Sequence, residues 1–354
     1  MFEIKFGNYL PAHFHGDPAR AKELPRVRVA VIGSGLWGYE HARAFHSNPF
    51  TDLVAVCGRN PERIAARAHE FSTTPYTDIG KMLDAERPDL VSLCLGNLDH
   101  FEPTLQVLGA GVPAFVEKPF VFELDQATKL LAAAEQRKLF FAINFNHRYA
   151  EPMLRAKQLI ACGELGEIVF ASWRFGGNHD GPFAHPHCNL IETQCHGIDG
   201  LLNFCGPIMH VSAEMTDKTG KGGFGTVVLA MRFANDAVGD LLGSYDTSYA
   251  YPDTHRCEIN GTKGRIVIED TCRKLTFNRL DDPVAQVWQA TFFDDESRNF
   301  AGSHDRHVAD MIRCFREKLP PPIPARQGYE VLRVCHAAIQ SHAKGRRVLL
   351  NEVG

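Results

Sequence analysis

The chain contains no apolar run that approaches the roughly 20 residues needed to span a bilayer, so its sequence predicts no transmembrane helix. Its first residues also lack a basic region followed by an apolar core, and we therefore predict no secretory signal peptide. There is no cluster of basic residues, and the formal net charge is −4. This charge pattern argues against a nucleic-acid partner and against attachment to a membrane surface.

The sequence has no CxxC pair, although it contains ten cysteines. The cysteines are scattered, and several lie in apolar runs, as Cys57, Cys94 and Cys335 do. This distribution predicts reduced, mostly buried thiols in a cytoplasmic protein. The residues 185–188 (His-Pro-His-Cys) and 195–196 (Cys-His) match no standard zinc spacing, so we predict no metal site and interpret them as polar residues that line a pocket.

A strand followed by a glycine-rich turn is the most informative local pattern. The β-branched, apolar run Val27–Ile32 is followed by Gly33, Gly35 and Gly38 and then by a segment compatible with a helix. In a dinucleotide-binding turn the first glycine permits the tight turn, the second lets the pyrophosphate approach the backbone, and the third lets the helix pack on the strand. The helix N-terminus would then face the phosphates.

Strand-like and helix-like segments alternate up to residue 145. Expected strands cover residues 27–32, 53–57, 90–95, 114–116 and 140–144, with expected helices at 61–71, 79–85, 101–110 and 125–138. This order predicts an α/β fold with a doubly wound parallel sheet, that is, a Rossmann domain over residues 25–145. Residues 1–24 are expected to form an irregular extension.

The pattern changes after residue 145. An expected helix at 152–161 and a strand at 168–175 lead into a polar loop rich in Gly and His and a segment at 190–204. Several β-like runs then follow without intervening helices, at 226–233, 238–245, 256–260, 265–269, 274–277 and 287–293, and helices are expected at 304–318 and 328–344. Residues 146–354 are thus predicted to form an α+β domain with a large, mostly antiparallel sheet.

The residues at the end of the second expected strand indicate which dinucleotide cofactor is preferred. Rossmann domains that bind NAD commonly place an acidic residue about 20 positions beyond the glycines, where it binds the ribose diol. Here that position holds Gly58, and Arg59 follows it. An arginine can pair with a 2′-phosphate, so the sequence predicts NAD(P) as cofactor and favours NADP over NAD. The alternative for Arg59 is a solvated loop cation.

Taken together with the glycine turn, several short motifs resemble those of the Gfo/Idh/MocA oxidoreductases, which are named for glucose–fructose oxidoreductase, inositol dehydrogenase and a rhizopine catabolism protein. The resemblance covers nearly the whole chain except residues 1–24. It is carried by residues 117–119 (Glu-Lys-Pro), 146–149 (Asn-His-Arg-Tyr), 163–168, 261–264 and 341–345, and by Glu192 four residues before His196.

The resemblance implies that Lys118, His196 and Glu192 are catalytic and that a nicotinamide dinucleotide binds the first domain. Glu192 stands where the family usually has Asp, and Gly96 stands where it often has Pro. The implied cofactor-binding residues are Gly33, Gly35, Leu36, Trp37, Gly38, Arg59, Asn60, Gly96, Asn97, His100, Glu117, Lys118 and Asn146. The expected substrate-binding residues are Lys118, Arg148, Trp173, His179, Glu192, His196 and Asp199.

Alcohol oxidation needs the chemistry that these residue types provide. A hydroxyl proton must leave as hydride passes to the nicotinamide, and a lysine of lowered pKa or an imidazole can accept that proton. On an α-helix Glu192 and His196 would share one face, so the carboxylate could orient the ring. Each residue also has a structural alternative: Lys118 in a surface ion pair, His196 as a core histidine, Glu192 as a charge on a helix face.

The sequence therefore predicts an NAD(P)-dependent dehydrogenase or reductase acting on a secondary hydroxyl or carbonyl of a sugar, an inositol or a related polyol. Two alternatives remain open at this stage. One is an enzyme that cleaves glycosides through transient sugar oxidation by bound NAD, and the other is a non-catalytic sensor of dinucleotide or sugar. We expect a homodimer or homotetramer that assembles through the C-terminal sheet.

Overall fold

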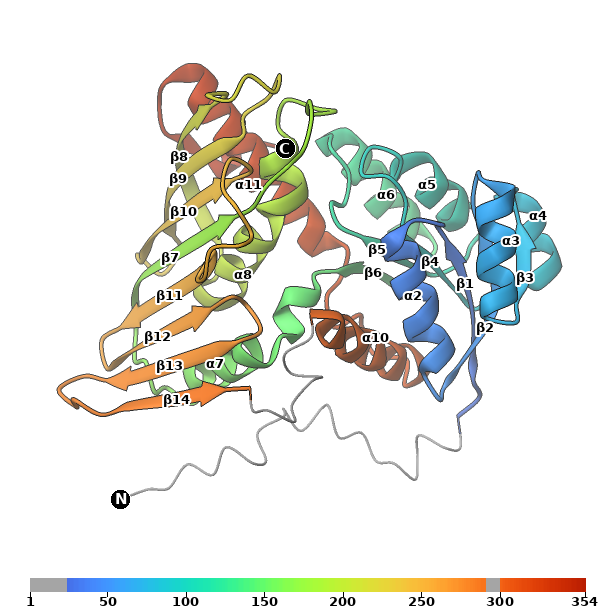
Figure 1. The fold of residues 1–354 in the computed structure, drawn as a ribbon, viewed down its shortest axis with the longest axis horizontal. Coiled ribbons are helices and arrows are strands. Elements are labelled where there is room, and N and C mark those ends of the chain that lie inside the picture. The colour runs from blue at the N-terminus through green and yellow to red at the C-terminus, as the bar shows by residue number, and fades with distance from the viewer. Residues whose placement is uncertain (1–23, 291–299) are drawn as a thin grey trace. The chain divides into compact units, whose positions relative to one another are not determined.

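A computed structural model describes residues 24–290 and 300–354 (Figure 1). Packing divides these residues into two compact units. The first is formed by residues up to 145 together with 304–330, and the second by residues 146–303 together with 331–354. The sequence placed the domain limits at 25–145 and 146–354, and these limits stay a prediction. In the division by packing, residues 304–330 return to the first unit.

The first unit is built on a six-stranded parallel sheet with the strand order β3-β2-β1-β4-β5-β6. This is the strand order of a Rossmann fold, with its switch point between β1 and β4. The strands are β1 Val27–Ile32, β2 Thr51–Cys57, β3 Thr74–Tyr76, β4 Leu90–Leu93, β5 Ala114–Glu117 and β6 Phe141–Asn144. The helices are α2 Leu36–Ser47, α3 Pro61–Glu70, α4 Ile79–Glu86, α5 Phe101–Gly109, α6 Leu124–Gln136 and α10 Phe300–Arg316.

Helix α10 belongs to the core of this sheet although it comes more than 150 residues later in the chain. Its residues Val308, Met311 and Ile312 are buried in one apolar cluster with Phe45 of α2 and Phe115 of β5. Burial of such side chains contributes about 1.5–3 kcal/mol each. The sequence pattern placed this helix correctly along the chain but could not show which sheet it covers.

The second unit contains a nine-stranded sheet in the order β14-β13-β12-β11-β7-β10-β9-β8-β15, in which only β7 and β10 pair in parallel among the described strands. Its strands are β7 Ile168–Gly176, β8 Ile208–Thr216, β9 Thr226–Phe233, β10 Val238–Ser244, β11 His255–Gly261, β12 Gly264–Glu269, β13 Lys274–Arg279, β14 Ala285–Gln289 and β15 Val348–Leu349. Its helices are η3 Asn146–Tyr149, α7 Glu151–Ala161, η4 Asn189–Thr193, α8 Cys195–Cys205 and α11 Arg326–Lys344, with η5 Leu350–Glu352 near the end.

One face of this sheet is covered and the other is open. In β9 the residues Val227, Leu229 and Met231 are buried and alternate with more exposed neighbours, as expected for a sheet with one packed face. Helices α7 and α8 lie against the buried side (Figure 1). The predicted fold class, a parallel Rossmann sheet plus an α+β domain with a mostly antiparallel sheet, is confirmed.

Three strands were not anticipated from the sequence, and one of them, β15, is only two residues long. β8 carries polar residues such as His210, Ser212 and Glu214 on its open face. Because they interrupt the apolar run, a simple search for apolar runs misses this strand. β3 is only three residues long. The strand expected at 287–293 corresponds to β14, and residues 291–293 lie outside the described residues. Over the described ranges no helix has the length and apolarity required to cross a membrane.

Candidate functional site

The glycine turn between β1 and α2 has the geometry that a dinucleotide needs. Gly33 has φ +144°, and a Cβ at this position would lie 1.9 Å from the carbonyl oxygen of Cys94. A Cβ at Gly38 would lie 2.4 Å from the carbonyl oxygen of Gly33, so the helix can pack this closely on the turn only because residue 38 is glycine. At Gly35, by contrast, a Cβ would meet no described atom within 4 Å.

The open space at Gly35 lies at the N-terminus of α2. Gly35 is the N-cap residue and has no side chain to satisfy the first backbone N–H groups of the helix. Such N–H groups, with the helix dipole, bind anionic phosphates. The adjoining Leu36 is 75% exposed. The residues present therefore fit a dinucleotide pyrophosphate, which these backbone groups would hold.

At the end of β2 the candidate ribose-binding residues are exposed. The Arg59 guanidinium is 82% exposed, and its Nη2 lies 2.7 Å from Oδ2 of Asp99, which follows β4. The Asn60 side chain accepts a hydrogen bond from the backbone N–H of Arg63 and so caps α3. Arg59 thus stands at the carboxyl edge of the sheet, where a 2′-phosphate could reach it, whereas Asn60 has a helix-capping role as well.

His100 fixes the loop that contains the candidate catalytic lysine. Its ring is fully buried, with Nδ1 2.7 Å from the carbonyl oxygen of Pro119 and Nε2 3.3 Å from that of Leu95. The shorter distance assigns the proton to Nδ1, which donates to Pro119. Burial lowers the pKa of His100 despite these two carbonyl oxygens, so the ring is neutral near pH 7. The predicted residues Gly96 and Asn97 lie in the turn that leads to His100.

Behind Lys118 lies a buried network of hydrogen-bonded polar groups. Nε2 of His41 lies 3.0 Å from Oε1 of Glu117, and its Nδ1 lies 2.7 Å from Oγ of Ser92. Asn144 donates to Glu117 through Nδ2 and accepts from His307, whose Nδ1 lies 2.8 Å from Oδ1. These groups come from α2, β4, β5, β6 and α10, and all of them are buried. They tie the returning helix to the end of β5.

The network keeps a buried carboxylate charged next to Lys118. Burial by itself raises the pKa of Glu117, but the hydrogen bonds from His41 and Asn144 and the charge of Lys118 bring that pKa below its ordinary value. The ionised Oε2 accepts a hydrogen bond of 2.8 Å from the backbone N–H of Lys118. Glu117 therefore holds the backbone of Lys118, while the half-buried Lys118 side chain starts at the carboxyl end of β5, where open α/β sheets bind ligands.

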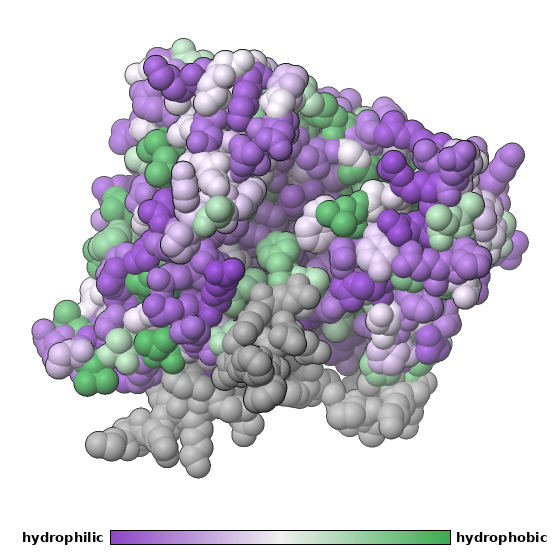
Figure 2. Space-filling model, viewed as in Figure 1, coloured by the Kyte–Doolittle hydropathy of each residue, from purple (hydrophilic) through white to green (hydrophobic). Residues whose placement is uncertain are grey.

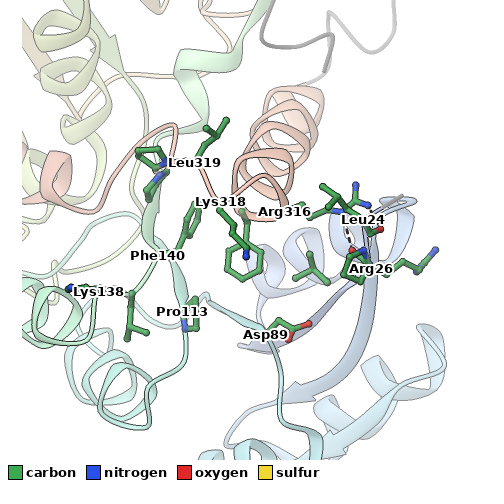
Figure 3. A pocket seen from close by; sticks show the side chains of 15 residues that line it. Leu24, Arg26, Asp89, Pro113, Lys138, Phe140, Arg316, Lys318 and Leu319 are labelled. Carbon is green, nitrogen blue, oxygen red and sulfur yellow. Dashed lines mark hydrogen bonds between the residues drawn. The ribbon is translucent and has the colours of Figure 1, made fainter. Parts of the chain in front are cut away.

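A cavity of about 630 Å³ in the same unit lies at the other end of the sheet (Figure 3). It is lined by residues that precede strands, such as Asp89, Pro113 and Phe140, and by Arg316 and Lys318 at the end of α10. Ligands of doubly wound sheets bind at the carboxyl ends of the strands. This cavity is at their amino ends and is not part of the candidate cofactor site.

In the second unit, Arg148 and Asp199 form a two-pronged ion pair. Nε and Nη2 of Arg148 lie 2.7 and 2.5 Å from the two carboxylate oxygens of Asp199, which is 1% exposed. The pair joins η3 to α8. Both residues were expected to bind substrate, and in this structure each one satisfies the other's charge, so a substrate contact by either stays a prediction.

The candidate catalytic histidine is stacked on a second histidine. The rings of His196 and His147 are 3.8 Å apart and inclined by only 6°. Both are buried, and the edge of Phe300 packs on the His147 ring at 5.1 Å. Next to His147, Asn146 donates to Oγ of Ser303 at 3.0 Å. The sequence pattern drew attention to residues 146–149 but not to this stack.

Glu192 lies in a π-helical turn, Asn189–Thr193, just before α8. The expected α-helical spacing to His196 therefore does not apply, because a π turn contains an extra residue; such turns often occur at functional sites. Burial, together with the charge and hydrogen bond of Glu192, raises the pKa of Cys188 to about 12. Burial also raises the pKa of Tyr245, whose hydroxyl bonds Thr193. An orienting contact from Glu192 to His196 stays a prediction.

Trp173 and His179 have different surroundings. Trp173 is buried between β7 and α8, where a Cβ at Gly197 would lie 2.6 Å from its indole ring. This packing accounts for the burial of the indole ring, but its buried Nε1 has no hydrogen-bond partner among the described residues, and a contact of Trp173 with substrate stays a prediction. The half-buried His179 ring stacks on Tyr245 at 5.4 Å and lies beside Phe183. In the described residues, no group of three or more metal-ligating side chains is placed to hold an ion.

The residues that sequence reasoning missed are the supporting ones: His41, Ser92, Asn144, His147, His304 and His307. His41 lies one helical turn beyond Gly38, facing the sheet, and that spacing could have marked it as inward-facing. Asn144 ends a buried strand, which is a common position for functional polar groups in such sheets. For the histidines of α10 no local signal exists, since their partners are more than 150 residues away.

Two family models match the chain. The oxidoreductase family model with an NAD-binding Rossmann fold matches residues 27–145, and the model of the family's C-terminal α/β domain matches residues 157–350. Among curated proteins, the D-glucoside 3-dehydrogenase of Escherichia coli is 27% identical over 92% of this chain and 97% of its own length. The inositol 2-dehydrogenase of Salmonella typhimurium is 21% identical over 90% of this chain and 95% of its own length.

Solved structures show the same fold. Levoglucosan dehydrogenase in complex with NADH and levoglucosan superposes with a TM-score of 0.83 at 20% identity, covering 92% of this chain and 99% of that one. The WlbA dehydrogenase of Bordetella pertussis, in complex with NADH and UDP-GlcNAcA, gives a TM-score of 0.78 at 19% identity. The match covers 92% of this chain and 98% of that one. With both domain models matched in order along most of its length, the chain belongs to the Gfo/Idh/MocA family of oxidoreductases.

Proposed function

We propose that this protein is a dehydrogenase that transfers hydride between NAD(P) and a secondary hydroxyl or carbonyl group of a sugar, an inositol or a related polyol. The observation that carries the proposal is the anchoring of Lys118 by the ionised, buried Glu117 at the carboxyl end of β5, in the same unit as the glycine turn. The sugar and inositol dehydrogenases among its relatives support the substrate class.

Lys118 and His196 are the residues to which we assign proton transfer. When bound, the nicotinamide ring would accept or donate the hydride. Lys118 would hold the reacting oxygen and either remove its proton or, as a cation, polarise the carbonyl in the reverse direction. The imidazole of His196 would accept or relay the proton near neutral pH. Glu192, Asp199, Arg148 and His179 are the polar groups proposed to surround the substrate.

The test is absorbance at 340 nm with each cofactor across a panel of sugars, inositols and simple glycosides. We expect reduction of one cofactor with a small set of substrates, and we expect Lys118→Ala and His196→Ala each to lower kcat by about 10²-fold or more. Near-normal kcat in both variants would refute the site. Glycoside cleavage without net reduction, by protein that retains dinucleotide through gel filtration, would indicate transient oxidation. Binding without turnover would indicate a sensor.

For the cofactor, we propose a preference for NADP over NAD. The support is the exposed guanidinium of Arg59 beside Gly58, where an acidic residue would otherwise bind the ribose diol. The matched variant is Gly58→Asp, whose Cβ would lie 3.0 and 3.2 Å from the Cδ1 and Cγ1 atoms of Ile64 and 3.5 Å from Oγ of Ser34. We expect it to shift the ratio of kcat/KM values toward NAD by at least tenfold. A wild-type enzyme that already prefers NAD would contradict the proposal.

We also propose assembly of two or more copies through the open face of the nine-stranded sheet. Exposed apolar residues recur on this face, including Phe170, Val228, Val238 and Leu242 on adjoining strands. Figure 2 shows hydrophobic surface along the left side of the molecule, over the strands of this sheet. Asp240 lies among them, opposite Ser172 on β7 and Ala230 on β9, with Arg174 and Arg232 at the diagonal positions, so two copies could match apolar and charged patches. Leu242→Asp should convert the oligomer to monomer in light scattering; a wild-type monomer would refute this assembly.

A reducing compartment is the location that the cysteines favour. All ten are free thiols, and nine of them are buried. Burial raises the pKa of several of these thiols, among them Cys257 and Cys335, which makes them poor nucleophiles for disulfide formation. We therefore propose a cytoplasmic location; a preparation from cells that showed native disulfides in its peptide map would contradict it.

A further inference from the structure

We propose that His147 is a positioning residue that fixes the ring plane of His196 and opposes a positive charge on it. The proposal rests on the catalytic role proposed for His196. The two imidazoles lie face to face at 3.8 Å with an inclination of 6°, and both are buried. A ring stacked in this way loses the rotation about its terminal torsion that an isolated histidine retains.

The backbone on both sides of the stack is held independently of the rings. His147 is followed by Arg148 in η3, and His196 precedes Asp199 by three residues in α8, so the ion pair of Arg148 and Asp199 joins the same two elements. Phe300 packs edge-on against His147 at 5.1 Å, and Phe175 lies on it at 6.0 Å. The rings of His147 and His196 are therefore held in contact in apolar surroundings with little access for water.

Stacking at this distance makes the two protonations compete. Two imidazolium ions 3.8 Å apart in a buried site repel strongly, so protonation of one ring disfavours protonation of the other. The titratable groups on the adjoining elements include Arg148 and Asp199, which neutralise each other, Glu192 on η4, and His255 on β11, which touches Phe175. Helix α7, which packs on η3, adds the ion pair of Glu151 and Arg155 and the cation of Lys157. Burial lowers the pKa of His255 to about 4, so it is uncharged near neutral pH.

We assign the first proton to His147, and repulsion from that charge then keeps His196 neutral and correctly oriented as the pH falls. A neutral ring can accept the hydroxyl proton, whereas an imidazolium cannot. The chain thus extends the working range of its proposed base toward acidic pH with a second histidine to which we assign no proton transfer with the substrate.

The experiment compares His147→Phe with His147→Ala in the full-length protein. Phenylalanine keeps a flat ring in the stack but cannot be charged, so the acidic midpoint of the kcat/KM profile should rise by about one pH unit, with kcat at its plateau within about threefold of wild type. Alanine removes the flat ring, and kcat should fall by about tenfold or more at every pH. His46→Phe, which replaces an exposed histidine at the end of α2 whose ring lies 5.4 Å from that of Phe71, is the matched control and should change neither quantity.

A second readout does not depend on activity. In protein with ¹³C-labelled histidine, the His196 ring resonance, assigned by its loss in His196→Gln, should titrate about one pH unit higher in His147→Phe than in wild type. An unchanged midpoint in both the profile and the resonance would overturn the proposal. If His196→Ala keeps full activity while the resonance shifts as expected, the proposed function fails and the coupling of the two rings stands.

Discussion

Glu117 in the first unit and Asp199 in the second are both buried carboxylates, and the two units stabilise them in different ways. Asp199 is matched by one permanent cation, Arg148, in a two-pronged geometry. Glu117 instead accepts hydrogen bonds from His41, from Asn144 and from the backbone of Lys118. A guanidinium keeps its charge at any relevant pH, whereas a histidine partner can change its protonation.

Asp199 and Glu117 have different partners because they hold different parts of the protein in place. The Arg148 pair joins two backbone elements and has no need to respond to the reaction. Glu117 holds the backbone of Lys118, the residue to which we assign proton transfer. Its other contacts connect it to His41 of α2 and, through Asn144, to His307 of α10. A network of several weaker bonds can tolerate a change of charge at Lys118 better than a single pair can, because each bond carries part of the compensation.

The largest effect should come from breaking the single pair. Arg148→Met leaves Asp199 buried without its cation, which costs about 3–5 kcal/mol of unfolding free energy. Urea unfolding followed by circular dichroism measures the change. The double variant Arg148→Met/Asp199→Asn removes both charges and should recover more than half of the loss. A loss below about 1 kcal/mol in the single variant would mean that the pair is not needed to neutralise Asp199.

Glu117→Gln should cost less, about 1.5–3 kcal/mol, because it weakens charged hydrogen bonds but keeps the side chain's shape. The pKa of Glu117 lies below its ordinary value of 4.5 in the folded protein, so its stabilisation is complete above that value and is lost as the pH falls toward the folded pKa. Unfolding curves at pH 7 and pH 4 test this, and the gap between wild type and variant should narrow at pH 4. An equal gap at both pH values would refute the role of the charge.

The sequence predicted those parts of the site that depend on neighbours in the chain. The steric demands on Gly33 and Gly38 follow from one turn, and Lys118 stands in a tripeptide that a family motif marks. Asn144 and His307, by contrast, are 163 positions apart and meet only because α10 packs back on the sheet. The strong periodicity of α10 predicts a helix with a buried face, but many sheets could bury that face equally well.

The π turn at Glu192 shows a second limit. The sequence interpretation assumed α-helical spacing between Glu192 and His196, since nothing in residues 189–193 excludes an α-helix. The π turn closes with the backbone N–H of Gln194 donating to the carbonyl oxygen of Asn189 at 3.0 Å, and the buried Asn189 side chain donates to the carbonyl oxygens of Gly225 and Gly243. Gly243 lies in β10 and Gly225 directly precedes β9, so tertiary contacts rather than local propensity select this turn.

The smallest effect on stability is expected for a third carboxylate, Asp99, whose pairing with Arg59 is exposed to solvent. Exposed ion pairs contribute little, so Asp99→Asn should change the unfolding free energy by less than about 0.5 kcal/mol. Its effect should appear in binding instead, because the Asp99 carboxylate competes with a 2′-phosphate for the guanidinium. We expect the KM for NADP to fall by about two- to fivefold at low salt, with the KM for NAD unchanged, and the difference to shrink at 0.5 M salt, where surface charges are screened. An equal change for both cofactors would show that Asp99 acts through the shape of its loop and not through its charge.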